Sequence, residues 1–251
     1  MDRVEIEGQE PTPEQLLAVT SAYGHFTAMQ VRDGKTRGLA LHMDRLAASN
    51  REVFDSAFDP DRTRFLIRHV LGDRADASVR VYVHRGEQGP IMVVTARAPA
   101  EMASPLRLRS VAYLRPDPHV KHVHTDQGLY REAAQRAHFD DAVLTAFDGR
   151  IAETTMANIG FFDEAGVIWP DAPMLDGITK QLLELYGPAH AISMRKRPVH
   201  RSELETMAGA FVSSARGIGR VSAIDGVAFD PSEEGVDALS RVYAAVPWDE
   251  V

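Results

Sequence analysis

The sequence predicts an α+β protein in which β-hairpins are interspersed with single helices. Several apolar runs flank tight-turn residues, such as Asp33-Gly34 and Asp148-Gly149, and these dipeptides are typical of hairpins. Only a few segments have the spacing of an amphipathic helix, and they do not alternate regularly with strands. This order favours an α+β fold over a doubly wound parallel sheet.

The first half of the chain contains a helix start, two hairpins and two amphipathic helices. Thr12-Pro13-Glu14-Gln15 is typical of a helix start, because a capping Thr precedes Pro and an acidic residue. Asp33-Gly34-Lys35 separates two expected strands, 25–32 and 37–42. The further elements expected in this half are a helix over 42–54, a helix opened by Asp59-Pro60, strands over 78–84 and 90–97, and a strand over 106–114.

Arg115-Pro116-Asp117-Pro118 is the best candidate for a linker between domains. Two prolines in three residues favour an extended backbone and oppose a helix. We therefore expect a smaller N-terminal domain over 1–115 and a larger C-terminal domain over 116–251.

The second half again combines hairpins with isolated helices. Asp148-Gly149 and Glu164-Ala165-Gly166 each separate a pair of apolar runs. A helix is expected to begin near Gly177-Ile178-Thr179, because Leu residues follow it at helical spacing. The further expected elements are helices over 123–138, 202–207 and 234–245, and strands over 192–198 and 209–214.

Composition excludes several classes of function. The chain has 251 residues, 28 basic and 36 acidic, for a formal net charge of −8, so it is a poor candidate for binding a nucleic-acid backbone. It has no cysteine, which excludes disulfides, zinc thiolate sites and cysteine nucleophiles. No apolar run reaches the roughly 20 residues that span a bilayer, and the N-terminal residues do not resemble a signal peptide. We expect a cytoplasmic protein that binds neither membrane nor nucleic acid.

Lysine is rare and occurs only at positions 35, 121, 180 and 196. An amine nucleophile must lie where its pKa falls enough to leave some neutral amine. Lys35 lies at a hairpin tip and Lys196 in an alternating strand, so both are expected to be solvated. Lys180, in the first turn of a helix, could be either solvated or shielded. Lys121 follows the two prolines and has three histidines nearby. Lys121 alone would be only a weak candidate.

An ordered set of motifs strengthens the case for Lys121. The motifs are Tyr23-Gly24-His25-Phe26-Thr27, Leu41-His42-Met43-Asp44-Arg45-Leu46, Val120-Lys121-His122-Val123, the stretch from Gly149 to Ile159, and Leu175-Asp176-Gly177-Ile178-Thr179-Lys180-Gln181. The set resembles the class IV, or fold type IV, enzymes that use pyridoxal 5'-phosphate (PLP), such as branched-chain and D-amino acid aminotransferases and aminodeoxychorismate lyase. The resemblance covers about residues 23–226, and it implies a smaller N-terminal α/β domain and a larger C-terminal pseudo-barrel α/β domain.

The resemblance implies a role for each matching residue. Lys121 would carry PLP as a Schiff base and act as the general base. Glu153 would keep the pyridine nitrogen protonated, with Asn158 nearby. The remaining implied roles are phosphate binding by Arg45, Gly177, Ile178 and Thr179, a second hydroxyl from Ser213 or, by preference, Ser214, and substrate binding near Thr27 and Arg216. No metal ligand is assigned.

Three readings of the function stay open. The first is transamination of a small amino acid or amine with a keto acid, because this activity is the commoner one in the family. The second is aminodeoxychorismate lyase. Lys121-His122 resembles a Lys-His dipeptide of that enzyme, and Phe26-Thr27 resembles its Phe-Thr dipeptide. The third is a binding protein, either degenerate or holding a metal through His119, His122 and His124 with Asp126 nearby. Family relatives are homodimers, so we expect a homodimer.

Overall fold

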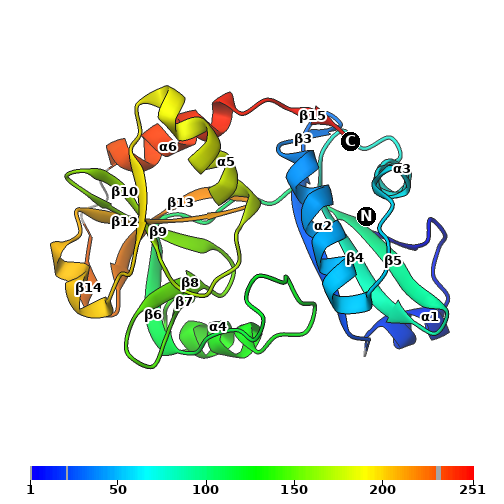
Figure 1. Ribbon diagram of the computed structural model, residues 1–251, viewed down its shortest axis with the longest axis horizontal. Helices are drawn as coiled ribbons and strands as arrows, with labels where there is room; N and C mark the ends of the chain where they lie inside the picture. The colour runs from blue at the N-terminus through cyan, green and yellow to red at the C-terminus, as the bar shows by residue number, and fades with distance from the viewer. Residues whose placement is uncertain (1, 21, 230–232) are drawn as a thin grey trace. The chain divides into compact units, whose positions relative to one another are not determined.

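The computed structural model describes residues 2–20, 22–229 and 233–251, and it divides into two compact units (Figure 1). The first unit contains the chain as far as Ala100, Val120–His124 and Pro247–Val251. The second contains Glu101–His119 and Thr125–Val246. The boundary expected after residue 115 lies inside the segment Glu101–His119 of the second unit. Lys121 belongs to the first unit. The division into two folding domains stays a prediction.

The first unit is a four-stranded antiparallel sheet with helices packed against it. The strand order is β1-β5-β4-β2, and a small two-stranded sheet pairs β3 with β15. The bounds are β1 Arg3–Ile6, β2 Gly24–Val31, β3 Lys35–Thr36, β4 Ala77–Gly86, β5 Gly89–Arg97, β15 Asp249–Glu250, α1 Pro13–Thr20, α2 Leu39–Phe54 and α3 Pro60–Leu71.

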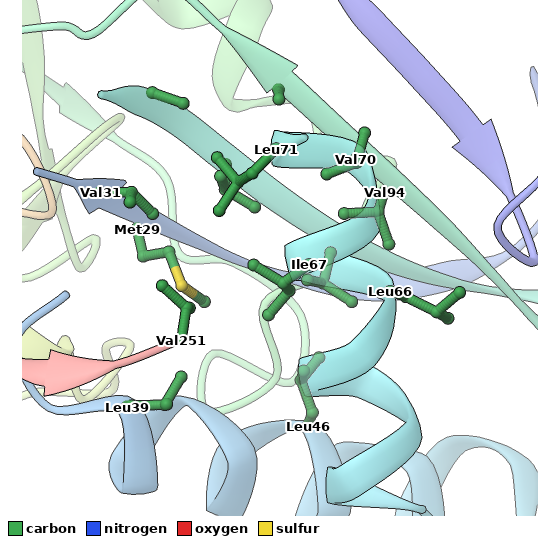
Figure 2. Packing of buried hydrophobic residues seen from close by; sticks show 14 of the residues in the cluster. Met29, Val31, Leu39, Leu46, Leu66, Ile67, Val70, Leu71, Val94 and Val251 are labelled. Carbon is green, nitrogen blue, oxygen red and sulfur yellow. The ribbon is translucent and has the colours of Figure 1, made fainter. Parts of the chain in front are cut away.

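The core of the first unit lies between this sheet and helices α2 and α3. Alternate residues of β2, including Met29 and Val31, face the helices, as the two-residue period of a strand requires. Figure 2 shows Ile67 and Val70 of α3 directed at the strands, and Val251 beside Met29. The last residues of the chain are therefore part of this core.

The strand expected over 37–42 is wrong, because the chain enters helix α2 at Leu39. Gly38 has φ 71° and ψ 40°, in the left-handed region that glycine occupies without steric cost. The Asp249 carboxylate then accepts a hydrogen bond from the Leu39 N–H over 2.9 Å, so a distant segment caps the helix. The strand after the Asp33-Gly34 turn is only Lys35–Thr36.

The second unit is built on a ring of strands closed on itself. The path β9-β12-β13-β6-β7-β8 returns to β9 through the pair Glu153 and Asn158, and β10, β11 and β14 extend it. The bounds are β6 Leu106–Ala112, β7 Asp141–Thr145, β8 Ile151–Thr154, β9 Asn158–Asp163, β10 Gly166–Pro170, β11 Met194–Arg197, β12 Gly209–Ser214, β13 Gly217–Ile224 and β14 Val227–Ala228.

Helices α5 (Ile178–Tyr186) and α6 (Glu233–Ala245) pack together on this unit (Figure 1). Leu183 of α5 and Leu239 of α6 share a buried cluster with Trp169 and Phe211. A separate cluster, which includes Leu108, Ile159 and Val212, fills the space among the ring strands. Helix α4 (Gln127–Arg136) and the short 3-10 helices η1 (Gly187–His190) and η2 (Arg201–Thr206) complete the unit.

Other elements differ from expectation at their ends or in kind. The helix expected over 123–138 begins only at Gln127, because residues 121–123 are extended along β2. The helix expected over 202–207 is the 3-10 helix η2. β1 and β13 were not expected. Within the residues described, no helix is both long and apolar enough to cross a membrane.

Candidate functional site

Lys121 lies in an extended segment that runs along β2, the edge strand of the first sheet. The Phe26 N–H donates to the Lys121 carbonyl over 2.9 Å, and the Val123 N–H donates to the Gly24 carbonyl over 2.9 Å. These bonds fix the backbone that immediately follows the Lys121 Cα. The Lys121 Nζ lies 4.9 Å from the centroid of the Phe26 ring, within the range of a cation–π contact.

The other three lysines form ion pairs with carboxylates. Lys180 contacts Asp176 at 3.0 Å and Glu184 at 2.8 Å, and Lys196 lies 3.2 Å from Asp171. Lys35 lies 3.0 Å from Glu250, and the hydrogen bond to that carboxylate raises the pKa of Lys35. All three ammonium groups are therefore engaged with carboxylates of the chain.

Arg45 reaches from α2 to β2 in the first unit. Its Nη2 donates to the Thr27 hydroxyl over 2.6 Å. The same hydroxyl lies 2.6 Å from His42 Nδ1. Thr27 and His42 are both buried, so two of the predicted site residues, Thr27 and Arg45, meet with His42 inside this unit.

Glu153 forms a buried ion pair with Arg115 in the second unit. The Arg115 Nε donates to Glu153 Oε1 over 2.9 Å, and the two residues are 6% and 5% exposed. Removal of two charges from water is costly unless they are paired. Arg115 therefore favours the ionised carboxylate at Glu153.

Glu153 and Asn158 both hold the backbone of Leu175. The Leu175 N–H donates to Glu153 Oε2 at 3.4 Å, and Asn158 Nδ2 donates to the Leu175 carbonyl over 2.7 Å. A Cβ on Gly177 would lie only 2.1 Å from Asn158 Oδ1, so this position requires glycine. These contacts set where α5 begins.

The first turn of α5 lies against the end of β12. A helix N-terminus offers backbone N–H groups without intrahelical acceptors, and here those groups belong to the Gly177-Ile178-Thr179 turn. The Thr179 hydroxyl donates to the Ser214 carbonyl over 2.7 Å. Ser214 Oγ accepts from the Arg216 N–H over 3.2 Å, and Arg216 itself is exposed.

Ser213 is the second hydroxyl of this region. Its side chain is 1% exposed, and its Oγ has no hydrogen-bond partner in residues 2–20, 22–229 and 233–251. A buried hydroxyl without a partner is costly. Ser213 also lies opposite Asn158 in the β12–β9 register, so the orphaned hydroxyl lies close to Asn158 and the start of α5.

The histidines around Lys121 have other contacts. His122 Nε2 lies 3.5 Å from the Tyr23 hydroxyl, and the two rings are 5.2 Å apart. In the described part of the chain, no cluster of three or more His, Cys, Asp or Glu side chains could hold a metal ion.

Two residues of these networks were not identified from the sequence. Arg115 was taken only as part of a linker, and its partner Glu153 lies 38 positions away. His42 was noted only as part of a motif.

Comparison with known proteins identifies the same architecture. The chain superposes on a branched-chain aminotransferase from Thermoproteus uzoniensis, solved with norvaline, with a TM-score of 0.85 and 16% identity, over 96% of this chain and 93% of the other. It superposes on a putative 4-amino-4-deoxychorismate lyase from Legionella pneumophila with a TM-score of 0.82 and 20% identity, over 91% and 93%. A hypothetical aminotransferase from Mycobacterium tuberculosis, in a PLP-bound form, gives 0.81 and 18% over 97% and 98%.

These likenesses confirm the predicted α+β, fold type IV architecture. No curated protein matches the sequence. The family model described as amino-transferase class IV matches residues 24–224, most of the chain. The chain therefore belongs to the class IV aminotransferase family, whose enzymes use pyridoxal 5'-phosphate as cofactor.

Proposed function

We propose that this enzyme is an aminotransferase that binds PLP covalently through Lys121 and moves an amino group between a small amino acid or amine and a keto acid. The observation that carries the proposal is the convergence of Glu153, Asn158 and the first turn of α5 on the backbone of Leu175 to Gly177. An acidic group and an anion-binding helix end are thereby held at a fixed spacing, as a cofactor with a basic nitrogen and a phosphate requires.

The residues of the second unit fit this cofactor. The helix N-terminus at Gly177, Ile178 and Thr179 suits the phosphate. The orphaned hydroxyl of Ser213 suits the same group, and we favour Ser213 over Ser214 because the Ser214 hydroxyl and carbonyl already accept bonds within the chain. Asn158 supports the site by holding Leu175.

Each titratable residue then has one role. Bound PLP supplies an electron sink for the electron pair left when the substrate Cα loses a proton. The Lys121 Nζ would hold the cofactor and would move that proton as the general base. The Glu153 carboxylate, kept ionised by Arg115, holds a proton on the pyridine nitrogen. Arg45 binds the phosphate as a planar donor.

The substrate end of the site is less fixed by these contacts. Arg216 is exposed on the turn after β12 and is our candidate for binding a substrate carboxylate. Thr27 was expected to help bind substrate, but it is 0% exposed and its hydroxyl contacts Arg45 and His42. We therefore do not assign Thr27 a direct contact with substrate.

Aminodeoxychorismate lyase is the second candidate. Lys121-His122 and Phe26-Thr27 resemble dipeptides of that enzyme, and a solved structure named a putative 4-amino-4-deoxychorismate lyase covers 91% of this chain. Both reactions begin with the loss of a proton from the substrate Cα, so the residues assigned above serve either one.

Incubation of the purified enzyme with PLP and a panel of amino acids, amines and aminodeoxychorismate separates the two candidates. Keto-acid formation that requires an acceptor supports transamination, and release of p-aminobenzoate without an acceptor supports the lyase. Lys121→Ala is the matched control, since it should abolish either product. Turnover that survives in Lys121→Ala would contradict the proposal.

We further propose a cytoplasmic homodimer, as expected for this family. One chain has a mass of 27.7 kDa. Sedimentation of the purified enzyme at micromolar concentration should give a species of twice that mass. A species of single-chain mass at all concentrations would contradict the dimer.

A further inference from the structure

Thr27, His42 and Arg45 form a continuous chain of polar contacts between β2 and α2. The Thr27 Oγ1 lies 2.6 Å from Arg45 Nη2 and 2.6 Å from His42 Nδ1. Arg45 Nη2 also approaches His42 Nδ1 at 3.5 Å. Thr27 is 0% and His42 is 3% exposed, so water does not compete with these contacts.

The chemistry of the three groups favours one direction for each of these hydrogen bonds. A guanidinium can only donate, so Thr27 Oγ1 accepts from Arg45. His42 Nδ1 lies 2.6 Å from the same oxygen, and a hydroxyl can either donate to a bare Nδ1 or accept from a protonated one. Arg45 Nη2, which can only donate, also lies 3.5 Å from Nδ1, so a bare Nδ1 suits both neighbours. We therefore infer a neutral ring with the proton on Nε2.

The electrostatics of the site agree with this assignment. Burial, and after it the positive charge of Arg45, hold the pKa of His42 well below its ordinary value. An imidazolium beside a guanidinium in a buried site would combine like charges with desolvation.

We infer that His42 and Thr27 are positioning residues that hold the Arg45 guanidinium ready for the cofactor phosphate. The inference rests on the phosphate role proposed for Arg45. A long arginine side chain loses rotamer freedom when it binds an anion. The hydrogen bond between one Arg45 Nη and the buried Thr27 hydroxyl already restricts the side chain in the folded protein. Phosphate binding therefore costs less conformational entropy. The Thr27 hydroxyl thus acts through Arg45.

The first test is the tautomer of His42 in the unaltered enzyme. Nitrogen NMR of histidine-labelled protein at neutral pH resolves the ring nitrogens, and the signal missing from His42→Asn assigns His42 among the ten histidines. We expect an unprotonated Nδ1 and a protonated Nε2. A protonated Nδ1, alone or in a charged ring, would overturn the inference, and this test does not depend on any variant that must bind cofactor.

The second test compares affinity for PLP with affinity for pyridoxal, which has no phosphate. Thr27→Val removes the hydroxyl and keeps the shape, whereas Thr27→Ser keeps the hydroxyl. We expect Thr27→Val to lower the preference for PLP over pyridoxal about tenfold, which corresponds to roughly 1.4 kcal/mol. Thr27→Ser should retain the preference. In an Arg45→Met background, Thr27→Val should have no further effect.

The outcomes separate this inference from the proposed function. If Arg45→Met lowers the preference and Thr27→Val does not, the positioning role is wrong and the phosphate role of Arg45 stands. If Arg45→Met leaves the preference unchanged, Arg45 does not bind the phosphate, and both ideas fall. A preference lost equally in Thr27→Val and Thr27→Ser would also overturn the positioning role, because the hydroxyl would not be its cause.

Discussion

At the scale of single residues, the buried pair of Glu153 and Arg115 is the most consequential contact in the second unit. Each side chain satisfies a charge that would otherwise be isolated from water. Loss of one partner from such a pair is far more damaging than loss of both, because it leaves an uncompensated charge. Arg115 thereby joins the backbone before Lys121 to the acidic group of the proposed site.

Arg115→Met should lower the free energy of unfolding of the apoenzyme by about 3–5 kcal/mol at neutral pH. The double variant Arg115→Met with Glu153→Gln should recover part of the loss, because no charge is then left unpaired. Urea denaturation measures both. Arg136→Met is the matched control, since Arg136 is 72% exposed in a surface pair. A loss no larger than in the control would contradict the account.

His25 should make the stability of the first unit depend on pH. Burial, which Asn50 partly offsets, and the nearby His122 and His84 lower the pKa of His25 to about 4. The unfolded value is about 6.5, so between these values the unfolded chain binds more protons. Stability is therefore full above pH 6.5 and is lost as the pH falls toward 4.

His25→Gln removes this proton linkage. Between pH 7 and pH 5, its free energy of unfolding should fall by about 2 kcal/mol less than that of the unaltered chain. Denaturation at the two pH values measures the difference. His190→Gln is the matched control, because His190 is an exposed histidine. Equal slopes in all three proteins would show that His25 does not titrate as described.

At the scale of elements, the hairpin and helix-start patterns predicted most of the fold. Thr12-Pro13 and Asp59-Pro60 mark helix starts that the structure contains, because capping is a local property. The strand expected over 37–42 was wrong because the cap of α2 comes from Asp249, 210 positions away. β13 was missed because it contains Gly217 and Gly219, and glycine is depleted in strands.

The candidate site was likewise predictable where it depends on local sequence and not where it depends on long-range contacts. Lys121, Glu153 and Arg45 could be proposed from the order of local motifs. Arg115 and His42 could not be, because their importance arises from partners brought together by the closed strand ring or by packing of α2 on β2. Sequence spacing shows which residue types are present, and long-range packing decides which of them meet.

The start of α5 should depend on Gly177. Gly177→Ala places a Cβ only 2.1 Å from Asn158 Oδ1, so Asn158 must shift, which weakens its hydrogen bond to the Leu175 carbonyl. We expect PLP affinity to fall at least about tenfold, or roughly 1.4 kcal/mol, measured by titration of apoenzyme. Gly128→Ala is the control, since nothing lies within 4 Å of its added carbon. Equal affinity in the two variants would contradict the role of Gly177.

At the scale of the whole molecule, distant segments complete both units. β8 and β9 close the ring of the second unit through one pair, Glu153 and Asn158, which are also two of the proposed site residues. In the first unit, the last residues of the chain pair with β3 and bury Val251 in the core (Figure 2). Each unit is therefore stabilised by contacts that join remote parts of the sequence.

Asp249 should contribute to stability through the distant start of α2. Asp249→Ala removes the acceptor of the Leu39 N–H, and loss of such a cap costs about 1 kcal/mol. Chemical denaturation measures the change. Glu250→Ala is the neighbouring control, because Glu250 forms an exposed pair with Lys35, and loss of such a pair should have little effect. An equal effect of the two substitutions would contradict a capping role for Asp249.

The central claim is that Lys121 holds the cofactor, and the four lysines of the chain make a direct measurement sharp. Holoenzyme reduced with borohydride fixes PLP to its lysine, and peptide mass spectrometry then locates the adduct. The account predicts a pyridoxyl group on Lys121 alone. An adduct on Lys35, Lys180 or Lys196, or none on any lysine, would contradict it.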